Sequence, residues 1–137
     1  NLGDAKSISY GNTFSVTPSL VAGGRSWAQV GACQIHSCGL TTAGQGFCWG
    51  NNGGKLGNGG TAESSNPSPL SGAPVLKSLA VGANHNCALS TASEVWCWGM
   101  NGNGQVGQAA VGPVGTFGLL HDLRHHRLVG RRARRHP

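Results

Sequence analysis

Alternating apolar and polar positions predict short β-strands arranged as two hairpins. Over residues 37–42 every second position is Cys, Leu or Thr, which is the period of two that a half-buried strand requires. A turn at Ala43-Gly44 follows, and residues 46–50 return as the partner strand. The same order recurs further on, with a turn at Ala92-Ser93 and a partner strand at residues 95–99. Two matching β-hairpins are therefore expected.

Two further strands flank each hairpin. Residues 27–33 and 76–82 carry matching apolar positions, and each predicts a buried strand with some bulging ahead of its hairpin. Residues 17–21 and 66–70 each contain a proline in a strand-like context. Since proline cannot donate to a strand ladder, these two segments are expected to form exposed sheet edges. The pattern thus predicts two four-stranded antiparallel sheets.

The two halves of this pattern are copies of each other. A shift of 49 residues aligns residues 18–53 with residues 67–102, and 13 of the 36 aligned pairs are identical. Chance would give about 2 or 3 identities at this composition, so the chain contains an internal repeat, which predicts a repeat architecture. The identical pairs include Pro18/Pro67, His36/His85, Cys38/Cys87, Leu40/Leu89, Cys48/Cys97, Trp49/Trp98 and Asn52/Asn101.

The end of each copy carries a motif. The second copy reads HNCALSTASEVWCWGMNGNGQVG over residues 85–107, and the first ends in FCWGNNGGKLG at Gly57. These residues resemble the repeat of the regulator of chromosome condensation family, in which each repeat forms one blade of a seven-bladed β-propeller. The resemblance covers residues 1–108. It implies an all-β fold with two four-stranded antiparallel blades of an incomplete seven-bladed-type propeller, followed by an irregular C-terminal tail.

The resemblance also implies structural roles for the residues of the repeat signature. The Trp-Gly dipeptide, the asparagine that follows it and the histidine all recur in both copies. We expect these residues to shape the blades and not to catalyse. The signature residues are His36, Trp49, Gly50, Asn52, His85, Trp98, Gly99, Asn101, Gly104 and Gly107.

The repeats divide the chain into a propeller part, residues 1–108, and a tail, residues 109–137. Within the propeller part we expect a remnant over residues 1–17, one repeat over residues 18–66 and a second repeat over residues 67–108. Two blades cannot close a propeller. We therefore expect the chain to be a piece of a longer protein, whose remaining blades are its neighbours.

The net charge of +6 belongs to the tail and not to the repeats. Before residue 121 four lysines and arginines stand against three acids, whereas residues 121–137 hold six arginines and one acid. The repeats thus lack the basic stripe that nucleic-acid binding requires, so nucleic acid is an unexpected partner for them. For the tail 121–137, nucleic acid is a possible but weak partner. Three explanations of the tail stay open: a solvated extension, a disordered segment that binds an anionic partner, and translation out of frame from a G+C-rich gene.

Four cysteines occupy opposed positions in the two predicted hairpins, Cys38 opposite Cys48 and Cys87 opposite Cys97. Opposed residues bring their Cα atoms to about 4.5 to 5.5 Å, which is within disulfide range. We favour two disulfides over the alternative of buried thiols. A third alternative, zinc held by His36, Cys38 and Cys48, has unusual spacing and no fourth ligand in reach.

Paired disulfides predict an oxidising compartment. Some receptor-kinase ectodomains and secreted bacterial proteins that resemble this repeat also carry a cysteine ahead of Trp-Gly. We therefore expect an extracellular, cell-surface or periplasmic protein, with a cytoplasmic or nuclear one as the alternative. No stretch has the features of a signal peptide or of a membrane span.

Cys33 has no counterpart, because the second repeat has Gly82 at that place. Its local turn is expected to differ from the turn at Gly82. Two interpretations of this thiol stay open: a buried unpaired side chain, or a contact with another chain or a missing blade.

The repeats hold few groups suited to catalysis. Their acids are Asp4, Glu63 and Glu94, all in predicted loops or turns, so no carboxylate partner is expected for either repeated histidine. Gly-rich segments such as residues 57–60 lack the helix and the Lys-Ser pair of a phosphate-binding loop. We expect a non-enzymatic protein-interaction platform with a protein partner and without cofactor or metal. Nucleotide exchange on a small GTPase, which the family implies, and chemistry by a fused domain are the alternatives.

Overall fold

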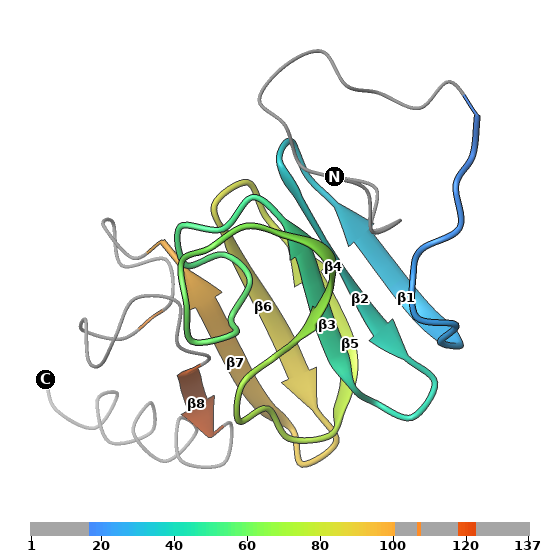
Figure 1. The fold of residues 1–137 in the computed structure, drawn as a ribbon. Helices are drawn as coiled ribbons and strands as arrows, with labels where there is room; N and C mark the ends of the chain where they lie inside the picture. The colour runs from blue at the N-terminus through green and yellow to red at the C-terminus, as the bar shows by residue number, and fades with distance from the viewer. Residues whose placement is uncertain (1–16, 101–106, 108–117, 123–137) are drawn as a thin grey trace, which may run out of the picture.

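The computed structural model describes residues 17–100, 107 and 118–122, and these residues form two sheets (Figure 1). Both sheets are antiparallel and four-stranded, in the orders β1-β2-β3-β4 and β5-β6-β7-β8. The strands are β1 (Trp27–Ala32), β2 (His36–Thr41), β3 (Gly46–Gly50), β4 (Ser64–Pro69), β5 (Leu76–Val81), β6 (His85–Ser90), β7 (Glu94–Gly99) and β8 (Gly118–Asp122). The described residues contain no helix, so the all-β prediction is confirmed. Within these ranges there is accordingly no long apolar helix of the kind that crosses a bilayer.

The two central hairpins have the predicted register. Cys38 pairs with Cys48 across β2 and β3, and Cys87 pairs with Cys97 across β6 and β7. The strands that precede the hairpins, β1 and β5, each have a register irregularity near their start. These irregularities lie 49 residues apart, which is the repeat shift, so the predicted bulging is present at matching positions.

A proline-bearing strand forms the edge of the first sheet, as predicted for residues 66–70. This strand, β4, pairs with β3 on one side only, so the missing N–H of Pro67 breaks no required bond. The matching prediction for residues 17–21 is wrong, because this segment forms no strand. By analogy with β4, its pairing partner would precede residue 17, outside the described residues. The sheets are thus out of phase with the sequence repeats, since β4 extends across the boundary after residue 66.

A strand in the C-terminal tail completes the second sheet. The sequence predicts an irregular tail after residue 108, but residues 118–122 form β8, which pairs with β7. Its register sets Cys97 opposite Gly118, in the manner in which Cys48 stands opposite Ser68 in the first sheet. The prediction is corrected at these five residues, because the backbone groups of an unpaired strand edge can pair with any extended segment. The rest of the tail lies outside the described residues.

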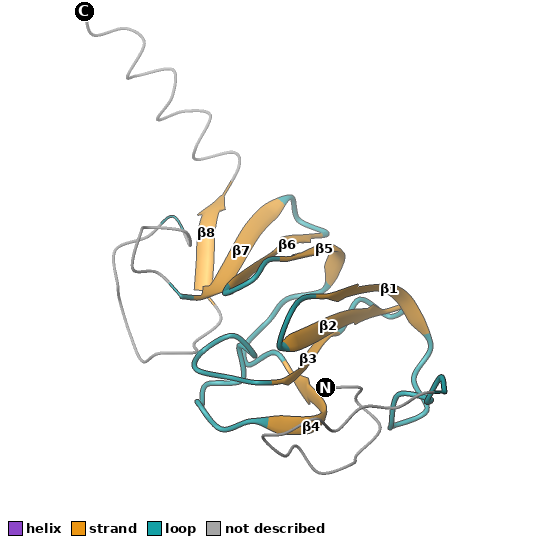
Figure 2. Cartoon of the chain, turned by 90° about the horizontal axis from the view of Figure 1, so that it is seen from above, coloured by secondary structure: helices purple, strands orange, loops and turns teal. Residues whose placement is uncertain are grey.

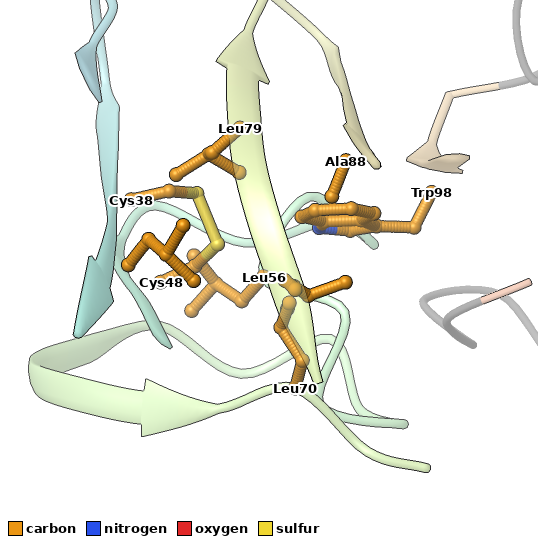
Figure 3. Close-up of a cluster of buried hydrophobic side chains, with 9 residues drawn as sticks. Cys38, Cys48, Leu56, Leu70, Leu79, Ala88 and Trp98 are labelled. Carbon is orange, nitrogen blue, oxygen red and sulfur yellow. A yellow bond between two sulfur atoms is a disulfide. The ribbon is translucent and has the colours of Figure 1, made fainter. Parts of the chain in front are cut away.

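The hydrophobic core lies between the two sheets, which face each other in Figure 2. Figure 3 shows side chains from both sheets meeting around the first disulfide. Fully burying a large apolar side chain contributes about 1.5 to 3 kcal/mol, so this layer is the main source of cohesion between the sheets. The first sheet and its loops supply Cys38, Leu40, Cys48, Leu56 and Leu70, and the second sheet supplies Leu76, Leu79, Ala88 and Trp98.

The turns of the two hairpins share a backbone geometry but not a sequence. Gly44 has a φ of +84° and Ser93 a φ of +64°, and each residue donates its N–H to the carbonyl three residues earlier at 3.0 Å. A Cβ at Gly44 would lie 2.5 Å from Cγ1 of Val75 in the second sheet, so this turn has no room for a side chain. A Cβ at Gly46 would lie 2.5 Å from Cδ1 of Leu70 and 3.1 Å from Cδ1 of Leu76, whereas the second repeat has Val95 at that place. Two glycines of the first repeat thus make room for its neighbour.

Replacing Ser93 by glycine is expected to raise the free energy of unfolding by about 1 kcal/mol. A side chain in the left-handed region costs about that much, and glycine removes the cost. Thermal denaturation beside the wild type measures the effect. The reverse change, Gly44→Ser, serves as the comparison and should destabilise by clearly more than Ser93→Gly stabilises, because its side chain meets Val75. Equal and opposite shifts would show that this close approach has no energetic weight.

Candidate functional site

The loop of residues 51–63, which joins β3 to β4, is organised by the signature residue Asn52. The Asn52 side chain is 0% exposed. Its Oδ1 accepts hydrogen bonds from the N–H groups of Gly54 at 2.9 Å and Leu56 at 3.2 Å. Its Nδ2 donates to the carbonyl oxygens of Gly60 at 3.1 Å and Ala62 at 2.8 Å. One side chain therefore replaces the backbone pairing that this loop lacks.

The ordered loop presents one backbone carbonyl to the second sheet. The carbonyl oxygen of Lys55 accepts hydrogen bonds from Nδ2 of Asn86 at 2.8 Å and from Nε1 of Trp98 at 3.0 Å. The next residue, Leu56, is fully buried in the core between the sheets. Gly57 follows with a φ of +61°, and a Cβ there would lie 2.7 Å from Cδ1 of Trp98. Three consecutive residues of the first sheet's loop thus dock on the second sheet.

The signature histidine of the first repeat belongs to the same network. His36 is buried, and its Nε2 lies 2.9 Å from Oδ1 of Asn86. Since Nδ2 of Asn86 donates to Lys55, its Oδ1 must accept, and His36 Nε2 carries the proton. The His36 Nδ1 atom is buried and has no hydrogen-bond partner among the described residues. A proton on Nδ1 would therefore be buried without an acceptor.

Burial lowers the pKa of His36 below its ordinary value of 6.5, and the nearby charge of Lys55 acts in the same direction. The hydrogen bond that His36 donates to Oδ1 of Asn86 opposes the effect without cancelling it. Desolvation penalises the charged imidazolium, so the neutral ring is the form that fits the interface. This histidine is structural in the geometry of the site, and the described residues place no carboxylate against it.

Acidification is expected to destabilise the fold through His36. Because folding lowers this pKa, the unfolded chain binds more protons than the folded chain once the pH falls below 6.5. The free energy of unfolding should therefore decrease between about pH 7.5 and about pH 5.5, as urea denaturation at several pH values would measure. His36→Gln should flatten this dependence. A slope unchanged by His36→Gln would contradict the assignment.

Both cysteine pairs lie at disulfide distance, and they differ in their surroundings. Cys38 and Cys48 are joined at an S–S distance of 2.12 Å, and both are fully buried between the sheets. Cys87 and Cys97 are joined at 2.01 Å. Asn86 and its neighbour Ala88 face the first sheet, so by strand alternation Cys87, which is half-buried, points to the opposite flank. Each bridge therefore lies on the same side of its own sheet.

A mild reductant is expected to open Cys87–Cys97 before Cys38–Cys48. Exchange requires a thiolate to reach the sulfur, and only the second bridge has a partly exposed cysteine. Alkylation and mass spectrometry over a reduction time course would give the order. Alanine at both positions of either bridge, whose cysteines are separated by 10 positions in sequence, should lower the free energy of unfolding by about 2 to 3 kcal/mol. Simultaneous reduction of both bridges in the folded chain would contradict the ordering.

The geometry excludes the zinc alternative, whereas both interpretations of the Cys33 thiol stay open. The zinc alternative at His36, Cys38 and Cys48 is wrong, because the two sulfur atoms bond to each other. Within the described ranges, no group of three His, Cys, Asp or Glu side chains could hold a metal ion. Cys33 is outside both bridges and half-buried. Its turn does not differ as expected, since Cys33 donates to the carbonyl of its histidine at 2.9 Å, just as Gly82 does at 2.8 Å.

The signature tryptophans are equivalent in sequence but not in bonding. Trp98 donates to the Lys55 carbonyl of the preceding loop. Trp49 is only 4% exposed, and its Nε1 has no hydrogen-bond partner among the described residues. Buried polar groups in native proteins nearly always have a hydrogen-bond partner. The unpaired Nε1 of Trp49 therefore distinguishes the face of the first sheet that is turned away from the second sheet.

The other signature residues lie at strand ends or in turns, or they fall outside the residues that the structure describes. Gly50 and Gly99 have φ values of +108° and +111° at matching strand ends, and Gly107 has a φ of +72°. His85 begins β6, as His36 begins β2. Asn101 and Gly104 lie outside the described residues, so their predicted roles stay predictions.

Two contacts of this interface are missed by sequence reasoning. Gln29 bridges the sheets, with its Oε1 accepting from the N–H of Leu79 at 3.0 Å and its Nε2 donating to the carbonyl of Leu79 at 2.6 Å. Asn86 is the second, and neither residue is shared with the other repeat, which has Ser78 and Ser37 at these places. The available sequence signal for both contacts was an amide side chain in one copy at a place where the other copy has serine.

One end of the two sheets carries exposed apolar side chains. Ile35, in the turn between β1 and β2, is 40% exposed, and Met100, after β7, is 49% exposed. Both are anchored by matching bonds, from Asn51 N–H to the Ile35 carbonyl and from Met100 N–H to the Asn84 carbonyl, each at 2.8 Å. The loop of residues 51–63 lies at this same end. We call Ile35, Met100 and the turns around them the loop end of the sheets.

Two four-stranded antiparallel sheets, stacked through a loop that repeats in sequence, define this chain as a pair of blades of a β-propeller. Models of the regulator of chromosome condensation (RCC1) repeat match residues 43–89 and residues 76–105. Residues 43–105 thus carry repeats of the RCC1 type, and the recognition made from the motif is confirmed for this part of the chain. No curated protein sequence gives a significant match.

Solved structures support the same fold. Human WBSCR16 is similar with a TM-score of 0.73 and 22% identity, covering 88% of this chain and 32% of that protein. Prp20p from Saccharomyces cerevisiae, described with its binding to Gsp1p and histones, has a TM-score of 0.72 and 16% identity, covering 90% of this chain and 32% of Prp20p. Yeast RCC1 (Prp20) bound to Kap60 has a TM-score of 0.65 and 18% identity, covering 77% of this chain and 27% of that protein. The chain therefore spans about a third of the length of these structures.

Proposed function

We propose that this chain is part of a larger propeller that serves as a non-enzymatic protein-interaction platform. The observation that carries the proposal is the unpaired Nε1 of the buried Trp49. In the second blade, the equivalent atom of Trp98 binds a carbonyl in the loop of the preceding blade. The first blade thus has the donor of the same contact, which supports a preceding blade as its natural neighbour.

The binding surface in this proposal is the loop end of the sheets. Its exposed apolar side chains, Ile35 and Met100, sit on turns that are fixed by backbone hydrogen bonds. Exposed apolar groups on a rigid support are typical of protein-interaction sites, because little ordering entropy is lost on binding. The solved neighbours described with Gsp1p, histones or Kap60 support a protein as the class of partner.

Matched variants test this surface. Ile35→Asp combined with Met100→Asp places two charges on the loop end, while Val75→Asp places a charge on a residue that is 56% exposed at the opposite end. Each chain is immobilised, incubated with an extract of its source cells and cross-linked, and the captured proteins are identified by mass spectrometry. A protein captured by wild type and Val75→Asp but lost with the double variant supports the proposal. Identical capture by all three chains, or none by wild type, refutes it.

An oxidising compartment, outside the cell or in the periplasm, is the second part of the proposal. Two disulfides at equivalent places support it, since reducing compartments keep such thiols unpaired. The mass of protein purified in the presence of an alkylating agent tests it. Four alkylated cysteines at positions 38, 48, 87 and 97 in protein from its native source would refute this part and leave the platform proposal standing.

Nucleotide exchange on a small GTPase, the alternative that the family implies, is not favoured. Exchange in such a propeller depends on loops from several blades, and this chain spans about a third of its structural neighbours. None of the residues in the interface network has a role that would transfer to exchange.

A further inference from the structure

The loop of residues 51–63 contains two Asn-Gly pairs with contrasting surroundings. Asn52-Gly53 and Asn58-Gly59 have the sequence that is most susceptible to deamidation, because glycine leaves its own nitrogen unhindered. In this reaction the glycine nitrogen attacks the asparagine side-chain carbon Cγ, and ammonia leaves. Water then opens the resulting succinimide ring to aspartate or isoaspartate. The same chemistry is thus offered twice within one loop.

The fold protects the first pair. Asn52 is fully buried, and both ends of its amide are held by backbone and side-chain hydrogen bonds. Its Cγ cannot turn toward the nitrogen of Gly53 without breaking bonds to Gly54, Leu56 and Ala62. Water, which must open the ring, is also excluded from a side chain with no exposed surface.

The surroundings of the second pair favour the reaction. Asn58 is half-buried, and its Oδ1 accepts from the N–H of Gly60 at 3.1 Å and from Nδ2 of Asn52 at 3.4 Å. Donors at this oxygen stabilise the negative charge that develops there when Cγ is attacked. Gly59 has a φ of +83°, and no heavy atom lies within 4 Å of the position a Cβ would take. The Gly59 side of this pair is therefore free of steric hindrance.

One hydrogen bond opposes the reaction. Nδ2 of Asn58 donates to Oγ of Ser68 in β4 at 3.1 Å, which fixes the amide group and ties the loop to the edge strand. The nitrogen that makes this bond is the leaving group, so deamidation removes the tie permanently. In the product, a carboxylate replaces the amide group that donated a hydrogen bond to Ser68.

We propose that Asn58 is a deamidation site of the folded protein and that its conversion loosens the β3–β4 loop, through which the first blade docks on the second. The carboxylate product cannot donate to Ser68, and an isoaspartate displaces Gly60, whose carbonyl is a partner of Asn52. The change thus reaches the network that places the Lys55 carbonyl and Leu56 against the second blade.

Trypsin separates the two sites, because Lys55 lies between them. Asn52 falls in the peptide of residues 26–55, and Asn58 falls in the peptide of residues 56–77. The native chain is kept at 37 °C in mildly alkaline buffer, and both peptides are followed by mass spectrometry for the exchange of NH2 for OH. We expect Asn58 to convert several-fold faster than Asn52 in the folded chain. In denaturant the two rates should become similar.

Three variants make the test specific. Gly59→Ala should slow conversion of Asn58 several-fold, and Ser68→Ala should accelerate it by releasing the leaving nitrogen. Asn58→Asp should lower the melting temperature more than Asn66→Asp, a control at an exposed asparagine of the same peptide. Equal rates at Asn52 and Asn58 in the folded chain would overturn the site. Equal melting temperatures of the two aspartate variants would overturn its effect on the blade contact.

Discussion

Asn52→Leu is expected to lower the free energy of unfolding by about 4 to 6 kcal/mol. Leucine has the same branching but forms no hydrogen bonds, so two N–H donors and two carbonyl acceptors of the loop lose their partner. Each buried polar group that loses its partner costs about 1 to 3 kcal/mol. A loss of this size approaches the whole stability of a small domain, which is commonly about 5 to 15 kcal/mol.

Urea denaturation of the variants followed by tryptophan fluorescence would measure this effect. The matched control is Asn51→Leu, the same change one residue earlier, where the half-buried side chain bonds to Glu63 and Lys55 at the surface of the loop. This control should cost no more than about 1 kcal/mol. If both leucine variants lose the same stability, the loop is not organised by Asn52.

Gly57→Ala is expected to lower the free energy of unfolding by about 2 to 5 kcal/mol, for two additive reasons. Alanine in the left-handed region costs about 1 to 2 kcal/mol, and a methyl group forced into a packed core costs about 1 to 3 kcal/mol more. The new Cβ would lie 2.7 Å from Cδ1 of Trp98 and 2.9 Å from Cδ2 of Leu70. Neither the indole ring of Trp98 nor the side chain of Leu70 can move without opening the contact between the blades.

Gly59→Ala separates these two reasons. Gly59 also has a positive φ, +83°, but a Cβ there meets nothing within 4 Å. Its substitution should therefore cost only the backbone term of about 1 to 2 kcal/mol. Thermal and urea denaturation of both alanine variants would give the difference. Equal losses would mean that the approach of Gly57 to Trp98 contributes nothing to stability.

The strands and the cysteine pairs are predictable from sequence because they depend on short-range regularities. A period of two defines β2, and the nine residues between Cys38 and Cys48 place them opposite each other in any symmetric hairpin. The repeat doubles the evidence, since the same spacing occurs at Cys87 and Cys97. Local geometry and burial are enough to fix these features.

The contact between the blades is not predictable in the same way. Its central acceptor is the carbonyl oxygen of Lys55, a backbone atom that every residue has, so no side-chain pattern marks it. Its donor Asn86 stands where the other repeat has Ser37, and a comparison of repeats therefore hides it. The edge strand β8 was missed for a related reason, because it is selected by the backbone of β7 and not by a pattern of its own.

The glycines at positions 44 and 46 have a consequence for how such rings can evolve. They form a recess that accepts Val75 and Leu76 of the following unit, and the second unit has Ser93 and Val95 where its own recess would be. A neighbour shaped like residues 67–100 therefore fits behind the first unit but collides behind the second. Placing a further copy of residues 67–100 behind the second unit would therefore require smaller side chains than Ser93 and Val95 at the new contact.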